Sequence, residues 1–178
     1  IIVPPLGGAD NVARLAEQVL MLAPEQFALA GLSMGGIVAM EVIRQAPERV
    51  ARLALMDTNP LAESAAVKAM REPQIVKAEA GNLTAVMRDE MKPQYLADGP
   101  RRADILDLCM AMAEELGPGI FVRQSRALQS RPDQQETLRG VTCPTLILCG
   151  RDDALCPVHR HELMADLIPH AILYIVEN

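Results

Sequence analysis

The sequence predicts an α/β fold with a mostly parallel sheet, helices on both faces and one large helical insertion. Short apolar runs alternate with helical patterns at both ends of the chain, whereas the long stretch between them contains only helical patterns. We therefore expect α/β core in residues 1–58 and 141–178, and the helical insertion in residues 59–140.

The first part of the core begins with an amphipathic helix. Asp10 can cap this helix, whose apolar residues recur with helical spacing until Pro24 ends it. The continuous apolar run Phe27–Ala30 is typical of a short strand that is covered on both faces.

A second helix and a second strand follow. Residues 37–43 are apolar except for Glu41, which predicts a helix buried on all sides until Pro47 ends it. Val50–Met56 is the next predicted strand, and the long connection between the two strands favours parallel, right-handed pairing.

The insertion is rich in Ala, Met, Arg and Glu. Its clearest helix should bury one apolar stripe, made of Ile105, Leu108, Cys109, Met112 and Leu116. We expect helices to stop at Pro73, Gly81, Pro93, Gly99-Pro100, Gly117-Pro118 and Arg131-Pro132.

The core pattern then resumes. Pro144–Cys149 predicts a strand, Pro157 opens a helix, and residues 171–176 predict a last strand. The helix should turn four apolar side chains inward, those of Leu163, Met164, Leu167 and Ile168.

Composition excludes several classes of function. The net charge is −6, from 17 basic and 23 acidic residues, and no basic run is present that could bind nucleic acid. No apolar run approaches the roughly 20 residues of a membrane span, so we expect a soluble, cytoplasmic protein with no membrane partner. The four cysteines form no CxxC pair, which favours free thiols over a metal site or a disulfide framework.

The chemistry is indicated by the pentapeptide Gly31-Leu32-Ser33-Met34-Gly35, which fits G-x-S-x-G between a predicted strand and a predicted helix. Such a turn forces the serine towards positive φ and exposes its hydroxyl. Ser33 is the predicted nucleophile, and the Met34 backbone N–H is the predicted oxyanion donor. The alternative, an ordinary serine cap in a glycine-rich turn, does not explain why both flanks match.

A serine nucleophile needs a histidine and an orienting carboxylate. The segment from Gly150 to Pro157 follows a buried strand with a G-x-x-D step and a trailing proline, and with it the chain resembles the α/β-hydrolase superfamily. The resemblance assigns the triad acid to Asp153. Asp152 is the neighbouring alternative, and Asp57 occupies the other place where this family keeps its acid.

The resemblance also implies a base that the three histidines do not supply. The family carries it on the loop after the last strand, and the chain stops at Glu177-Asn178, so we expect both ends of the family domain to lie outside the sequence. We expect His159, His161 and His170 to be surface or helix-cap residues; His159 or His161 as the base is the less favoured alternative. An oxyanion role for Gly7-Gly8 is likewise disfavoured.

By the same resemblance the insertion is a lid. Its methionines, which include Met70, Met87, Met91, Met110 and Met112, either line an adaptable apolar pocket or hold the lid helices together.

The function implied is a serine hydrolase, without a cofactor, that cleaves carboxylic esters of small to medium apolar substrates through an acyl-enzyme on Ser33. Perhydrolysis, thioester cleavage, acyl transfer and C–C hydrolysis use similar sites. A non-catalytic protein of this fold that binds a ligand or partner is the alternative from another class. An open strand edge would favour homo-oligomers.

Overall fold

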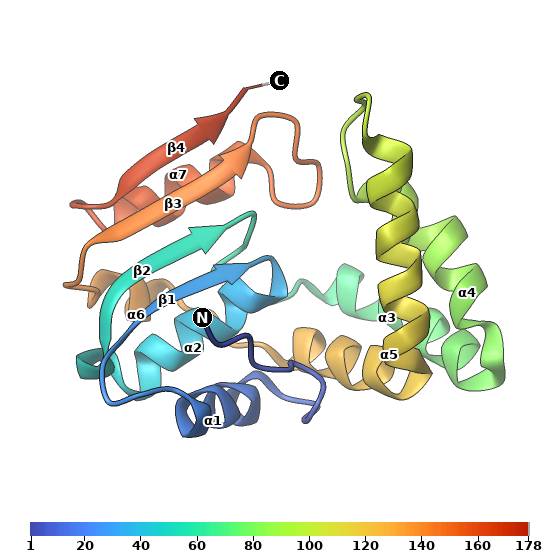
Figure 1. Ribbon diagram of the computed structural model, residues 1–178, viewed down its shortest axis with the longest axis horizontal. Coiled ribbons are helices and arrows are strands. Elements are labelled where there is room, and N and C mark those ends of the chain that lie inside the picture. The colour runs from blue at the N-terminus through green and yellow to red at the C-terminus, as the bar shows by residue number, and fades with distance from the viewer. Residues whose placement is uncertain (178) are drawn as a thin grey trace.

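The computed structural model describes residues 1–177 (Figure 1). The core elements are α1 (Val12–Leu22), β1 (Phe27–Leu32), α2 (Met34–Gln45), η1 (Pro47–Arg49), β2 (Val50–Met56), α6 (Gln135–Arg139), β3 (Thr145–Gly150), α7 (Val158–Leu167) and β4 (Ile172–Val176). Between β2 and α6 lie α3 (Ala65–Lys77), η2 (Ala78–Asn82), α4 (Leu83–Ala85), η3 (Val86–Met91), η4 (Lys92–Gln94) and α5 (Arg102–Ser130). All four predicted strands are present.

The four strands form one parallel sheet in the order β1-β2-β3-β4. Leu32, the last residue of β1, pairs with Met56 of β2, which in turn pairs with Leu148 of β3. The carboxyl ends of the strands are therefore in register, and the loops that follow β1, β2 and β3 leave the sheet at the same edge (Figure 1). This confirms the predicted α/β fold class.

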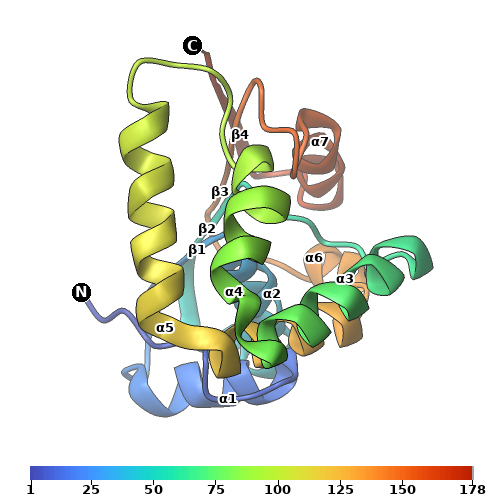
Figure 2. The same ribbon diagram turned by 90° about the vertical axis from the view of Figure 1, so that its right-hand side faces the viewer.

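Helices α2, α6 and α7 lie on one face of the sheet, and α1 packs beside α2 (Figures 1 and 2). Their inward side chains form the main core, in which Leu15, Met40, Leu55 and Ile147 are fully buried. We also expected helices on the opposite face of the sheet. Among the described residues, the β4 side chains at positions 172, 174 and 176 are exposed on that face.

The predicted helix cap at Asp10 is wrong by one residue. Asn11 is the N-cap of α1, because its side-chain oxygen accepts a hydrogen bond from the Arg14 N–H at 3.0 Å. Asp10 instead accepts a hydrogen bond from the Asn11 side chain. The helix ends at Leu22, before Pro24 as predicted.

Most of the predicted insertion, from α3 to α5, lies beyond the carboxyl ends of the strands (Figure 1). The predicted range of residues 59–140 also included α6, but this helix packs against α2 and α7 of the core. Gly81 and Gly117 break its helices, with φ of 86° and 77°, as the sequence predicted. Pro73 was expected to end a helix but lies inside α3. No helix in residues 1–177 is both long and apolar enough to cross a membrane.

The predicted buried stripe of the long insertion helix is wrong. Leu108, Met112 and Leu116 are each about half exposed, whereas the side that α5 buries carries Leu106. Helical spacing fits more than one stripe of such an apolar helix, and the packing partner decides which is buried.

Three of the methionines hold the insertion together. Met87 is buried in a small second cluster with Ala78 and Leu83, and Met91 and Met110 pack against it. Met70 is 62% exposed and Met112 53% exposed. The structure therefore favours the interpretation in which Met87, Met91 and Met110 hold the insertion helices together over the one in which they line an apolar pocket.

A buried ion-pair cluster joins the two ends of the insertion. Glu63, which precedes α3, accepts hydrogen bonds from Arg71 at 2.7 and 2.8 Å. Arg131, which follows α5, lies 3.6 Å from the same carboxylate and donates to the Leu61 carbonyl. The segments that enter and leave the insertion thus meet at one buried charge.

A second buried carboxylate, Glu41, lies in the middle of the buried helix α2 and is 1% exposed. It accepts hydrogen bonds from Arg44, Gln45 and the buried Gln134 at 2.8 to 2.9 Å. Burial alone would raise the pKa of Glu41, but these hydrogen bonds together lower it below the ordinary value of 4.5.

This arrangement predicts a pH-dependent contribution of Glu41 to stability. A carboxyl with a lowered folded-state pKa stabilises the fold above its unfolded-state pKa, and this stabilisation is lost as the pH falls through the folded-state pKa. At neutral pH we expect Glu41→Gln to lower the free energy of unfolding by about 1–3 kcal/mol, because donors are left unpaired.

Urea unfolding of both proteins from about pH 6 to about pH 3 tests this, and the difference should shrink towards low pH. The exposed Glu48→Gln is the matched control and should change little. A difference that does not depend on pH would contradict the assignment.

Candidate active site

Ser33 occupies a sharp turn between β1 and α2. Its backbone has φ 50° and ψ −116°, one of two positive φ values at non-glycine residues in the described chain. The Ser33 N–H donates to the Met56 carbonyl at 2.9 Å, which extends the pairing of β1 with β2. The unusual backbone that the sequence predicted at Ser33 is confirmed.

Two glycines allow this turn, but only one belongs to the pentapeptide. A β-carbon on Gly31 would lie 2.4 Å from the Gly35 carbonyl oxygen, and one on Gly36 would lie 2.5 Å from Thr58 Oγ1. A β-carbon on Gly35 would come only within 4.0 Å of Leu6. The turn therefore needs Gly31, inside the pentapeptide, and Gly36, directly after it.

The start of α2 offers a backbone donor beside Ser33. Met34 is the first residue of the helix, and the first N–H groups of a helix have no partner within it. The Ser33 carbonyl accepts the later N–H groups, those of Gly36 at 3.0 Å and Ile37 at 3.3 Å. The Met34 N–H therefore has no acceptor within α2, and its role as the oxyanion donor stays a prediction.

Asp153 lies in the loop after β3, at the same edge of the sheet as Ser33. Its Oδ1 accepts hydrogen bonds from the N–H groups of Leu155 at 2.8 Å and Cys156 at 2.9 Å. These bonds fix the carboxylate on its loop. Asp152, the alternative acid, is exposed.

Asp57 follows β2, between Ser33 and Asp153 in the order of the sheet. It has φ 41°, and its Oδ1 accepts a hydrogen bond from the Gly150 N–H at 3.1 Å. Burial raises the pKa of Asp57, and the neighbouring Asp153 carboxylate raises it further. The edge therefore brings both candidate acids together, and burial there favours the protonated form of Asp57.

The histidines do not all lie where the sequence placed them. His159 and His170 are exposed as expected, and His170 contacts the Cys143 carbonyl before β3, at the other edge of the sheet. His161 was predicted to lie on the surface and is fully buried, because α7 turns it inward one turn before Met164.

His161 contacts the loop after β2. Its Nε2 accepts a hydrogen bond from the Thr58 N–H at 3.1 Å, so this nitrogen is not free to take a proton from Ser33. Thr58, also fully buried, donates its hydroxyl to the Ser33 carbonyl at 2.8 Å. Thr58 was not among the site residues predicted from the sequence. The helical spacing of His161 with Met164 and Ile168 was the signal that could have placed it inside.

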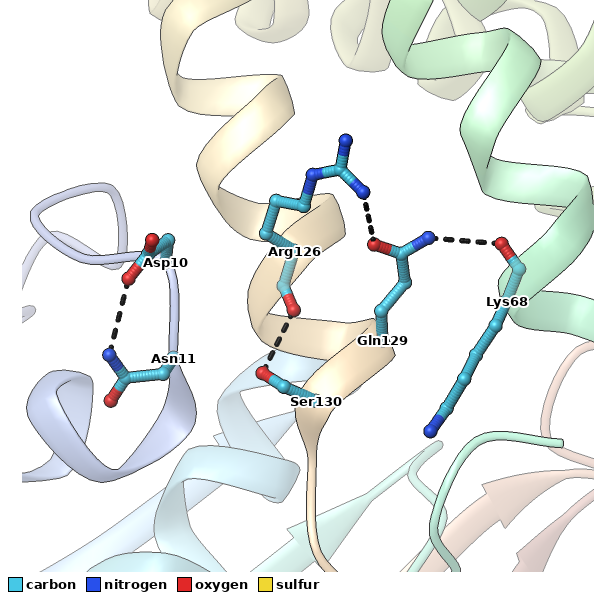
Figure 3. A pocket seen from close by; sticks show the side chains of 6 residues that line it. All are labelled: Asp10, Asn11, Lys68, Arg126, Gln129 and Ser130. Atoms are coloured by element: carbon cyan, nitrogen blue, oxygen red, sulfur yellow. Dashed lines mark hydrogen bonds between the residues drawn. The ribbon is translucent and has the colours of Figure 1, made fainter. Parts of the chain in front are cut away.

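Two surface hollows lie away from this edge. Figure 3 shows one of them, opposite Asp10 and Asn11. Gln129 of α5 accepts a hydrogen bond from Arg126 of the same helix and donates one to the Lys68 carbonyl of α3. Neither hollow is lined by Ser33 or Asp153. Among residues 1–177 no three His, Cys, Asp or Glu side chains are grouped to hold a metal ion.

Comparison with known proteins decides the family. The model of the alpha/beta hydrolase family matches residues 3–178. The chain belongs to the alpha/beta hydrolase family. The resemblance inferred from the pentapeptide and from the G-x-x-D step is thereby confirmed.

Two relatives are an esterase and a putative hydrolase by name. A pimeloyl-[acyl-carrier protein] methyl ester esterase of Vibrio parahaemolyticus is 28% identical over 170 residues, which cover 90% of this chain and 65% of the relative. A putative carbamate hydrolase of Yersinia enterocolitica is 26% identical, over 90% of this chain and 58% of the relative. The chain thus spans less than two thirds of either protein.

A solved structure has a similar fold. A thermophilic esterase from Thermogutta terrifontis superimposes with a TM-score of 0.86 at 26% identity, over 99% of this chain and 66% of that one. These similarities support a hydrolase.

Proposed function

We propose that Ser33 is the nucleophile of a carboxylester hydrolase. The observation that carries this proposal is the strained Ser33 turn at the start of α2, with a carboxylate on the same sheet edge. Positive φ at a serine persists only where the surrounding structure enforces it, and such strain concentrates at functional sites.

The proposed reaction uses Ser33 and the Met34 N–H at this edge together with a histidine base. Ser33 Oγ attacks the ester carbonyl, a histidine accepts its proton, and the Met34 N–H stabilises the negative oxygen that forms. The histidine then returns the proton to the leaving alcohol. Water, activated by the same histidine, releases the acid from the acyl-enzyme.

Asp153 is the proposed orienting acid. Its carboxylate is held by two backbone N–H groups, whereas burial favours the protonated form of the alternative, Asp57. An orienting acid must stay ionised to stabilise the imidazolium that forms during catalysis. The proposal assigns the base to none of His159, His161 and His170.

An apolar ester of small to medium size is the proposed substrate. Leu32, next to the nucleophile, is 59% exposed, and Leu155, next to the acid loop, is 48% exposed. The insertion stands over the same edge and is the proposed lid. Apolar surface around a few convergent polar groups is typical of such sites. The relatives named above act on ester and carbamate carbonyls, which fits the same chemistry.

Replacing the nucleophile tests the proposal. We expect Ser33→Ala to lower kcat/KM of the full-length protein for p-nitrophenyl butyrate by at least about 10³-fold, with little change in Tm. Ser130→Ala, at the exposed end of α5, is the matched control and should retain activity. Full activity in Ser33→Ala would place the nucleophile elsewhere. No esterase activity in the unaltered protein would favour the alternative, a ligand-binding protein of the same fold.

Replacing the acids tests the second assignment. We expect Asp153→Asn to lower kcat by as much as about 10⁴-fold, because the histidine can then adopt the wrong tautomer. Asp152→Asn should be mild, and Asp57→Asn should cost less than Asp153→Asn. Steady-state kinetics on the three variants decide between the acids. If Asp57→Asn proves the most damaging, the acid is Asp57.

A further inference from the structure

Two buried polar side chains beside the Ser33 turn have no role in the proposed reaction. His161 on α7 and Thr58 after β2 are both fully buried, and hydrogen bonds connect them to each other and to Ser33. We propose that they act as positioning residues that hold the Ser33 turn in its reactive conformation. This inference rests on the proposed role of Ser33.

The contact with Ser33 is made at its carbonyl group. Thr58 Oγ1 donates to this oxygen at 2.8 Å, beside the first helical bonds of α2. Fixing the carbonyl restrains ψ of Ser33, and hence the direction in which the Met34 N–H points. Thr58 therefore acts on the nucleophile and on the proposed oxyanion donor together.

The position of Thr58 is itself restrained. Its side chain fills the space where Gly36 lacks a β-carbon, since an added β-carbon would lie 2.5 to 2.7 Å from three Thr58 side-chain atoms. This packing fixes the side chain of Thr58 against the first turn of α2. A displacement of the loop after β2 would therefore reach Ser33 directly.

His161 fixes the backbone of the same loop. A backbone N–H can only donate, so Nε2 must accept, and the ring is the neutral tautomer with its proton on Nδ1. Burial lowers the pKa of His161 and favours this form, although the Pro157 carbonyl, Asp57 and Asp153 act in the opposite direction. A protonated ring could not accept the Thr58 N–H.

The two hydrogen bonds join the loops that follow β1 and β2 to the helix that follows β3. Ser33 follows β1, Thr58 follows the end of β2, and α7, which carries His161, begins at the end of the Asp153 loop after β3. The distance between nucleophile and acid is thus set partly through His161. Misplacement of a reacting group by about 1 Å can cost about 10²-fold in rate.

Variants at position 161 test the acceptor role in the full-length protein. His161→Leu removes the acceptor, whereas His161→Gln keeps a side-chain oxygen that can accept the Thr58 N–H. Met164→Leu, one turn further along α7 and also fully buried, is the matched control. For each variant, kcat, KM, Tm and the rate at which a fluorophosphonate labels Ser33 are measured.

We expect His161→Leu to lower kcat and the labelling rate by about 10-fold to 100-fold with little change in KM. His161→Gln should recover most of this loss, and Met164→Leu should react like the unaltered protein. Thr58→Val, which removes the hydroxyl but keeps the shape, should reproduce the loss if His161→Leu does not fold.

Three results would overturn the inference. His161→Leu and Thr58→Val could react at the unaltered rate per folded molecule, the Gln variant could be no better than the Leu variant, or Met164→Leu could be equally slow. Failure of the proposed function is distinguishable, because in that case either the unaltered protein would show no hydrolysis or Ser33→Ala would retain hydrolysis and labelling.

Discussion

The candidate site depends on the close approach of the first turn of α2 to the end of β1. A side chain at position 31 would collide with the Gly35 carbonyl, so a glycine is needed there for the chain to pass from strand to helix at the single residue Ser33. Ser33 takes a positive φ as a result. The cost of such a conformation, about 1–3 kcal/mol, is met by the hydrogen bonds to Met56 and Thr58 on either side of it.

Buried polar groups keep the surroundings of this turn rigid. Glu41 ties the middle of α2 to Gln134, and Glu63 ties the entrance of the insertion to its exit. A buried carboxylate is tolerated only when its hydrogen bonds are satisfied, and both have several partners. The core that carries Asp57 and Asp153 is therefore held rigid. The insertion has its own small apolar cluster.

The strands, the sharp turn at Ser33 and the loop after β3 that carries Asp153 were predicted correctly from the sequence, because they depend on local patterns. The catalytic roles of Ser33 and Asp153 stay predictions. β2 was placed at its observed bounds, since an apolar run between polar turns admits few alternatives. The buried face of α5 was wrong, because its pattern fits several stripes and only a neighbouring helix decides between them. The hydrogen bond between Thr58 and His161 was missed because its two residues lie 103 positions apart in the sequence. Hydrogen bonds over such separations leave no periodic signal.

The central claim, that the strained turn makes Ser33 the reactive nucleophile, can be tested by mapping where a fluorophosphonate attaches to the full-length protein. Trypsin releases this turn as the peptide of residues 15–44, in which Ser33 is the only serine, and which contains no threonine or tyrosine. The account predicts, by mass spectrometry, one stoichiometric adduct on this peptide and none in the Ser33→Ala variant. An adduct on any other peptide, with residues 15–44 unmodified, would contradict it.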